Sequence, residues 1–186
     1  MRHLPFIALA PLLLLGLAAE TAHAQADPPS DADKVRPYVG QWSLTADDPE
    51  AQIDRAVAEG TEALGFGLRE IARERLAGAI DAERRVDVRL DGEVVVITLG
   101  SWGPHRLPLD GRFVRADAED GTRLQARAMI AHGSLVIEQR TGEGARVVYF
   151  HRRGDRLVLG MRLTADRLPR DIVYQLPYGR ARIARR

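Results

Sequence analysis

The chain of 186 residues contains no cysteine. This absence excludes disulfide bonds, thiol catalysis and metal sites built from thiolates. Lysine is almost absent as well, with Lys34 the only one, yet 27 basic residues stand against 26 acidic ones, for a net charge of +1. Proteins that bind nucleic acid normally carry a basic excess. We therefore expect no nucleic-acid partner.

The amino-terminal segment has the order of a secretory signal peptide. A short basic start at 1–3 precedes an apolar run at 4–19, and residues 20–24 end in a small-x-small pattern. The apolar run contains two prolines and is shorter than the roughly 20 residues of a membrane-spanning helix. We expect a cleavable signal peptide at 1–24 and a soluble exported protein, located in the periplasm or, alternatively, outside the cell.

The rest of the chain divides into a leader and one domain. Residues 25–36 are polar and contain two adjacent prolines, which predicts a flexible leader. Residues 37–186 have the length of a single domain. Within it, an Asp-Asp-Pro-Glu start and apolar residues at helical spacing predict a helix over about 49–80, broken near Gly65. The apolar stripe predicts that Leu68 and Ile71 are buried against a sheet.

Alternating apolar and polar residues replace the helical pattern from residue 85 onward. Asp91-Gly92 separates two alternating runs, which is a strong hairpin signal. Further turn signals recur about every ten residues, and each run has one apolar and one charged face. The pattern predicts a mainly β fold, an antiparallel meander barrel of about eight to ten strands with one helical excursion after the first strand.

The first strand carries a resemblance to a known family. Gly40-Gln41-Trp42 followed by a β meander resembles the lipocalin or calycin pattern. That resemblance implies that the Trp42 ring closes the base of the barrel and that a late arginine, Arg180 or else Arg182, packs across it. A helix stands here in place of the long lipocalin loop, the T-D-Y motif is missing, and no helix follows the last strand. We therefore interpret the architecture as lipocalin-like and assign Gly40, Trp42 and Arg180 a structural role.

Three longer segments carry a second resemblance. Residues 66–76, 107–112 and 168–180 are similar to a family of small exported bacterial proteins that has no assigned function. The resemblance implies export and a lipocalin-like β domain, and it implies no particular chemistry.

Catalytic patterns are weak. Ser101 lies near His105 and Asp110, but Leu99 stands where the G-x-S-x-G elbow requires glycine. A turn between two strands is the preferred interpretation of this segment. We assign no catalytic residue, and a hydrolase ranks third among the functional hypotheses.

Metal and cofactor patterns are also weak. The histidines at 105, 132 and 151 lie on three separate segments without the close pairing that metal sites usually show. The glycines around Phe66 lack the strand-to-helix context of a phosphate-binding loop. We therefore expect neither a metal nor a cofactor.

The remaining hypotheses concern binding. Several residues expected to face the barrel interior are small or flexible, and these leave room for a cavity. The leading hypothesis is non-covalent binding of a small apolar molecule or lipid. Its alternative is a filled barrel that acts in the cell envelope through protein contacts. The basic run 180–186 is interpreted as a solvated terminus. The candidate cavity residues are Ala126, Ala128, Met161 and Tyr174.

Overall fold

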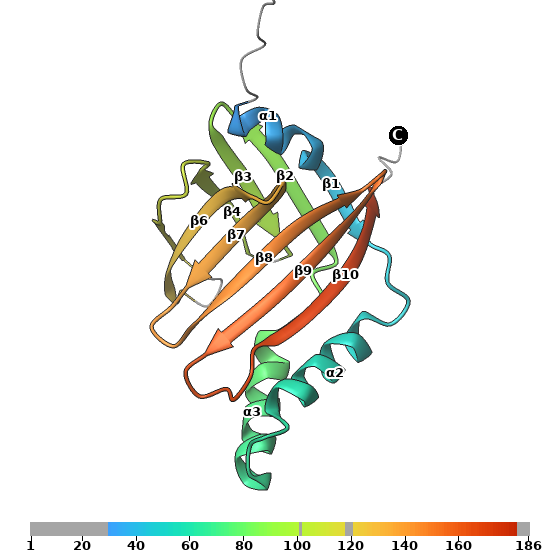
Figure 1. Ribbon diagram of the computed structural model, residues 1–186, viewed down its shortest axis with the longest axis vertical. Coiled ribbons are helices and arrows are strands. Elements are labelled where there is room, and N and C mark those ends of the chain that lie inside the picture. The colour runs from blue at the N-terminus through green and yellow to red at the C-terminus, as the bar shows by residue number, and fades with distance from the viewer. Residues whose placement is uncertain (1–29, 101, 118–120, 182–186) are drawn as a thin grey trace, which may run out of the picture.

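A computed structural model describes residues 30–100, 102–117 and 121–181 of the chain (Figure 1). The expected signal peptide, Ser101, Arg182 and the end of the basic run lie outside the described residues. The strands are β1 (Gly40–Leu44), β2 (Arg85–Asp91), β3 (Val94–Leu99), β4 (Trp102–Pro108), β5 (Val114–Asp117), β6 (Arg123–Ala131), β7 (Ser134–Arg140), β8 (Gly144–Arg153), β9 (Arg156–Ala165) and β10 (Ile172–Arg180).

These ten strands form one antiparallel sheet in the order β4-β3-β2-β1-β10-β9-β8-β7-β6-β5. Strands β2 to β4 pair in sequence order, as do strands β5 to β10. Strand β1 joins these two groups because it pairs with both β2 and β10. The sheet therefore curls into a nearly closed barrel whose two edges are β4 and β5 (Figure 1). The predicted meander barrel is confirmed, as is the hairpin at Asp91-Gly92, where Gly92 has φ +58°.

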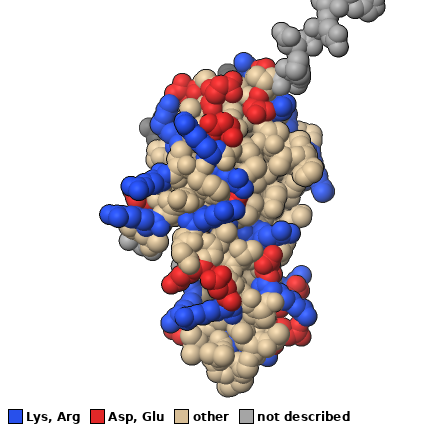
Figure 2. Space-filling model, turned by 60° about the vertical axis from the view of Figure 1, so that its left-hand side comes forward, with Lys and Arg blue, Asp and Glu red and all other residues tan. Residues whose placement is uncertain are grey.

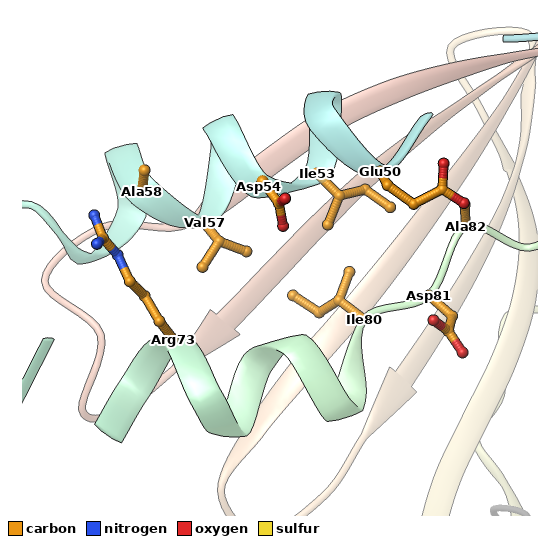
Figure 3. A pocket seen from close by; sticks show the side chains of 9 residues that line it. All are labelled: Glu50, Ile53, Asp54, Val57, Ala58, Arg73, Ile80, Asp81 and Ala82. Carbon is orange, nitrogen blue, oxygen red and sulfur yellow. The ribbon is translucent and has the colours of Figure 1, made fainter. Parts of the chain in front are cut away.

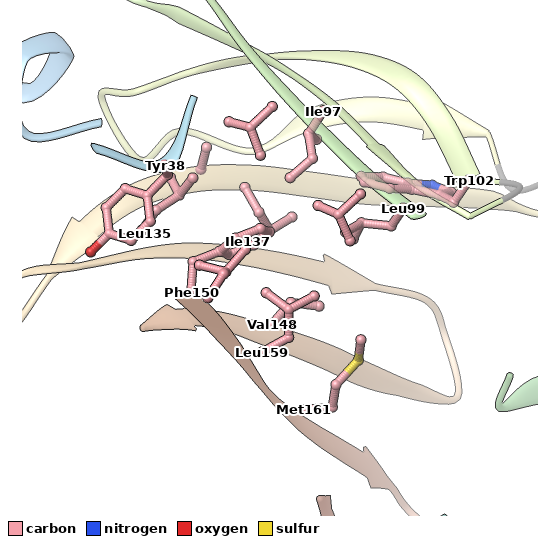
Figure 4. Packing of buried hydrophobic residues seen from close by; sticks show 14 of the residues in the cluster. Tyr38, Ile97, Leu99, Trp102, Leu135, Ile137, Val148, Phe150, Leu159 and Met161 are labelled. Carbon is pink, nitrogen blue, oxygen red and sulfur yellow. The ribbon is translucent and has the colours of Figure 1, made fainter. Parts of the chain in front are cut away.

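Inward side chains form rows across the sheet, because residues that pair directly opposite one another point to the same face. The row nearest the turns β7–β8 and β9–β10 contains Ala126, Gln139, Arg146, Leu163 and Ile172. The next row contains Ala128, Ile137, Val148, Met161 and Tyr174, and the third contains Ile130, Leu135, Phe150, Leu159 and Leu176. Figure 4 shows part of the packed apolar interior, which is one continuous cluster.

One end of the barrel is closed by a short helical segment. Helix α1 (Asp31–Val35) and the 3-10 helix η1 (Arg36–Tyr38) lie across it (Figure 1). Val35 is fully buried, and the Tyr38 hydroxyl donates to the carbonyl of Gly133, 2.7 Å away. The leader expected at 25–36 is therefore wrong over 31–36: this part is folded because Val35 and its neighbour Ala32 are buried against the barrel core.

The helices α2 (Pro49–Thr61) and α3 (Phe66–Ala79) hang from the opposite end, which we call the mouth (Figure 1). The predicted break between them is confirmed. Asp48 begins α2 by accepting a hydrogen bond from the backbone nitrogen of Ala51, 3.0 Å away. Helix α2 packs on β10 where Gly60 approaches Ile172, so closely that an added Cβ would lie 2.7 Å from the Ile172 side chain.

The expected burial of Leu68 and Ile71 is wrong. Their side chains are 64% and 51% exposed, and that of Phe66 is 84% exposed. The cause is the position of α3, whose first turns stand beyond the barrel rim with no strand beneath them (Figure 1). Arg69 holds this arrangement by donating from Nη2 to the carbonyls of Glu62 and Leu64, at 2.6 and 3.0 Å.

Candidate functional site

A groove of about 840 Å³ lies between α3 and the rim of the barrel. The helix contributes apolar side chains, and the facing wall comes from the turn between β7 and β8 and the segment between β9 and β10. This volume falls within the range of small-molecule sites, about 300–1,000 Å³. Charged groups stand at its edges. The apolar lining is Leu64, Leu68, Ile71, Leu76 and Leu168, and the charged edge is Arg75, Glu143, Asp166 and Arg167.

Charge is unevenly spread along the long axis of the molecule. Figure 2 shows bands of acidic and basic side chains around the barrel and around the upper part of the helical pair, whereas the lower tip carries few of either. This tip is the region where α2 turns into α3, next to the exposed side chains of Phe66 and Leu68. An apolar tip bordered by charged side chains is suited to contact with another apolar surface or with an apolar molecule.

A second hollow of about 450 Å³ lies between the two helices. Ile53 and Val57 of α2 point across it toward Ile80, which follows α3 (Figure 3). These three side chains are buried, and Arg73 lies at the far side of the hollow, where α3 faces Ala58 (Figure 3). The hollow thus has an apolar floor between the two helices, and the charged side chains of Glu50, Asp54 and Asp81 stand around it (Figure 3).

Just inside the mouth, polar side chains interrupt the apolar interior. Arg146 of β8 points inward, and its Nη2 lies 3.1 Å from Oε1 of Glu83 and 3.4 Å from the sulfur of Met161. Glu83 precedes β2, and its carbonyl accepts a hydrogen bond from the Tyr178 hydroxyl at 2.7 Å. The Arg146 side chain is 23% exposed and that of Glu83 is 10% exposed. The ion pair is therefore inside the barrel, yet open to solvent on the mouth side.

Burial controls the ionisation of the tyrosines around this pair. Burial raises the pKa of Tyr174, with smaller contributions from the charges of Arg146, Glu83 and Asp81. It also raises the pKa of Tyr178 far above the ordinary value, and the negative charge of Glu83 adds to the effect. Both phenols therefore remain neutral hydrogen-bonding groups at neutral pH.

The sequence-based cavity residues all face the interior. Ala126, in the row nearest the mouth, and Ala128 are fully buried, while Met161 and Tyr174 are 1% and 5% exposed. They occupy the two rows nearest the mouth, next to Arg146, which sequence reasoning missed. The alternation of β8 carries the missing signal, because Arg146 shares a parity with two buried residues of the same strand, Val148 and Phe150. That a ligand contacts these residues stays a prediction.

The residues to which we assigned a structural role lie together. The guanidinium carbon of Arg180 stands 4.2 Å from the centre of the Trp42 ring, and Trp42 is 1% exposed. Arg180 Nη1 donates to the carbonyl of Val39 at 2.7 Å, and Trp42 Nε1 donates to that of Tyr38 at 2.9 Å. Gly40 has φ +137°, and a Cβ there would overlap Arg180 Nη1.

Of the weak catalytic candidates, Ser101 lies outside the described residues, and Asp110 pairs with Arg112. His105 stacks on Trp102 with ring centres 4.2 Å apart, and burial lowers its pKa. His151 instead lies 2.9 Å, through Nδ1, from the hydroxyl of Ser134. The described ranges hold no cluster of three or more His, Asp or Glu residues arranged to bind a metal. Nor do they include a helix long and apolar enough to cross a membrane.

Comparison with known proteins identifies the fold. No protein-family model and no curated protein matches the sequence. A secretory abundant heat soluble protein of Ramazzottius varieornatus is 11% identical, with a TM-score of 0.52 over 82% of this chain and 98% of that one. A fatty acid binding protein of Schistosoma mansoni, solved with arachidonic acid, is 12% identical, with a TM-score of 0.50 over 80% of this chain and 99% of that one. Such likeness shows a shared lipocalin-like barrel and nothing finer.

Proposed function

We propose that the protein binds a small apolar molecule or lipid non-covalently in the groove between α3 and the barrel rim. The observation that carries the proposal is the exposed apolar face of α3 over that groove. Leu68 and Ile71 line the groove and are more than half exposed. Large exposed apolar groups gathered at one place are typical of a binding surface. A bound apolar chain would remove them from water.

The packing of the interior favours the mouth as the binding region. In the third row from the mouth, Leu135, Phe150 and Leu159 are fully buried and belong to the continuous core. Small barrels usually fill such positions with side chains. A ligand that approaches from the mouth therefore has room in the groove, and the nearest interior rows contain the short side chains of Ala126 and Ala128. The fatty acid binding protein of Schistosoma mansoni supports the proposal, since that protein accommodates arachidonic acid within the same fold.

The test uses a matched pair of charge substitutions. Leu68→Asp places a carboxylate in the groove, whereas Val173→Asp places one at another exposed apolar position, 53% exposed on β10 and outside the groove. Both exposed sites should tolerate the change within about 0.5 kcal/mol of unfolding free energy. We expect Leu68→Asp to weaken binding of a long-chain lipid probe at least about tenfold, measured by calorimetry, with Val173→Asp close to wild type.

Two results would contradict the proposal. Equal loss in both variants would mean that the probe binds exposed apolar surface without specificity. Absence of lipid binding by the wild-type protein, together with saturable binding of an envelope protein that Leu68→Asp abolishes, would instead support the rival hypothesis of a protein-interaction module.

We also propose that the protein is exported and acts in the periplasm. The support is the sequence pattern of residues 1–24, with its basic start, apolar run and small residues at the expected cleavage site. The resemblance of residues 66–76 and 168–180 to small exported bacterial proteins agrees with this location. Processing would leave a chain that begins at Gln25.

A further inference from the structure

Four buried side-chain donors, which include those of Arg69 and Trp102, have no acceptor within the part of the chain that the structure describes, and two of the four are side by side inside the mouth. One is Nε of Arg146 and the other is the side-chain amide nitrogen of Gln139. Gln139 is 6% exposed, and buried donors without acceptors are rare because each one forfeits the hydrogen bonds it makes to water. Such a pair of donors therefore points to an acceptor that the protein itself does not supply.

The two donors belong to adjacent side chains. Gln139 of β7 and Arg146 of β8 are direct cross-strand partners, and both point inward from the row nearest the mouth. Directly opposed residues have Cβ atoms about 4.5–5.5 Å apart. On the other side of Gln139 stands Ala126, which has a short side chain and is fully buried. Both donor atoms are shielded from water, so an acceptor at the end of a bound chain would reach them by displacing side chains at the mouth, and it would then meet both donors.

The charges around the donors decide what kind of acceptor fits. Arg146 already faces the carboxylate of Glu83 at 3.1 Å, which neutralises its positive charge. Glu83 packs closely against Gly100, where an added Cβ would overlap its carboxylate. The exposed carboxylate of Asp81 adds a second negative charge that acts on the same region at Tyr174. A ligand carboxylate would therefore enter a site without net positive charge and would lie near Glu83, which is unfavourable in a partly buried position.

We infer that Gln139 and Arg146 form a head-group site for an uncharged acceptor, such as the carbonyl oxygen of an ester or amide, at the end of an apolar chain. The inference rests on the proposed function and narrows its ligand class from any lipid to a neutral lipid with a carbonyl head. The apolar chain would occupy the groove along Leu68 and Ile71, and the head would reach the first interior row. Glu83 contributes to the specificity of this site, because its negative charge repels anionic head groups such as the carboxylate of a fatty acid.

The decisive experiment compares three probes of the same chain length, a saturated fatty acid, its methyl ester and the alkane, by titration of the wild-type protein at neutral pH. We expect the ester to bind about tenfold more tightly than either of the others, since one or two hydrogen bonds are gained without a charge penalty. Tighter binding of the fatty acid than of the ester would overturn the inference. Equal binding of all three would overturn it too, while leaving the proposed function intact. If none of the three binds, both the proposed function and this inference fail.

Two variants and a control test whether Gln139 and Glu83 cause the expected differences in affinity among the three probes. Gln139→Leu should reduce the advantage of the ester over the alkane to less than about threefold. Gln125→Leu, an exposed glutamine on the outer face of β6 beside Ala126, should leave that advantage unchanged. Glu83→Gln frees the charge of Arg146 and should strengthen fatty acid binding about tenfold. An ester advantage that survives Gln139→Leu in a folded protein would show that the donors do not receive the head group.

Discussion

The contact between Trp42 and Arg180 allows a quantitative test of how the barrel is closed. Trp42→Ala removes a fully buried indole that also donates to the carbonyl of Tyr38. Large aromatic truncations in cores cost about 3–5 kcal/mol, so we expect this variant to lose most of its stability and to give little folded protein. A milder change, Trp42→Leu, keeps an apolar side chain and removes the ring face that Arg180 covers.

Arg180 contributes through two contacts. Its guanidinium stacks on the ring at 4.2 Å, which is worth about 0.5–1 kcal/mol at an exposed position. Its hydrogen bond to Val39 is charge-assisted, but the exposed location keeps its net value near about 1 kcal/mol. We therefore expect Arg180→Ala to cost about 1–2 kcal/mol of unfolding free energy. Because only the stacking depends on the indole, the coupling with Trp42→Leu should be about 0.5–1 kcal/mol.

The assay is guanidinium unfolding followed by far-ultraviolet circular dichroism, which does not depend on the removed tryptophan. Arg156→Ala is the matched control, an exposed arginine at the start of β9, and should change stability by less than about 0.5 kcal/mol and show no coupling with Trp42→Leu. A coupling energy indistinguishable from that control, or a Trp42→Ala variant that loses less than about 1 kcal/mol, would refute the reasoning and the closing role of Trp42.

Two further predictions concern other regions. Burial raises the pKa of Tyr178, so this phenol stays neutral in the native state and ionises more readily on unfolding; stability is therefore full below the ordinary tyrosine pKa of about 10 and falls as pH rises above it. Unfolding midpoints measured between pH 8 and 11 should fall more steeply for the wild type than for Tyr178→Phe, and parallel curves would contradict this. For export, intact mass of the secreted chain should correspond to residues 25–186; a product that keeps residues 4–19 would indicate a membrane anchor.

The sheet was predictable because strand periodicity is a local property. Alternation over residues 85–90 and the Asp91-Gly92 turn specify a hairpin without knowledge of the rest of the chain. The same rule places Ala126 and Met161 inside. It also places Arg146 inside, although arginine side chains usually face water. A charge is tolerated there because Arg146 pairs with Glu83, which lies 63 positions earlier in the chain.

The helical segments were harder to predict because their environment is set by distant parts of the chain. The apolar stripe through Leu68 and Ile71 is real, but a stripe does not specify whether a sheet, a ligand or solvent covers it. For α1 the sequence contains a local signal: Ser30 accepts a hydrogen bond from the backbone of Asp33, a capping pattern that starts a helix inside the expected leader. The two adjacent prolines of residues 25–36 instead indicate a flexible segment.

The two ends of the barrel differ in what a ligand would have to displace. At the α1 end, entry requires breaking the hydrogen bonds from Tyr38 to Gly133 and from Arg152 to Pro37, and separating Tyr38 from the ring of Phe150. Buried aromatic contacts and hydrogen bonds of this kind each contribute stability that is lost on opening. At the mouth, the exposed face of Leu68 and the solvent-accessible side of Arg146 are reached without breaking any of these contacts. Entry from the mouth therefore preserves the contacts that close the α1 end, and this asymmetry favours the mouth as the side from which a ligand would bind.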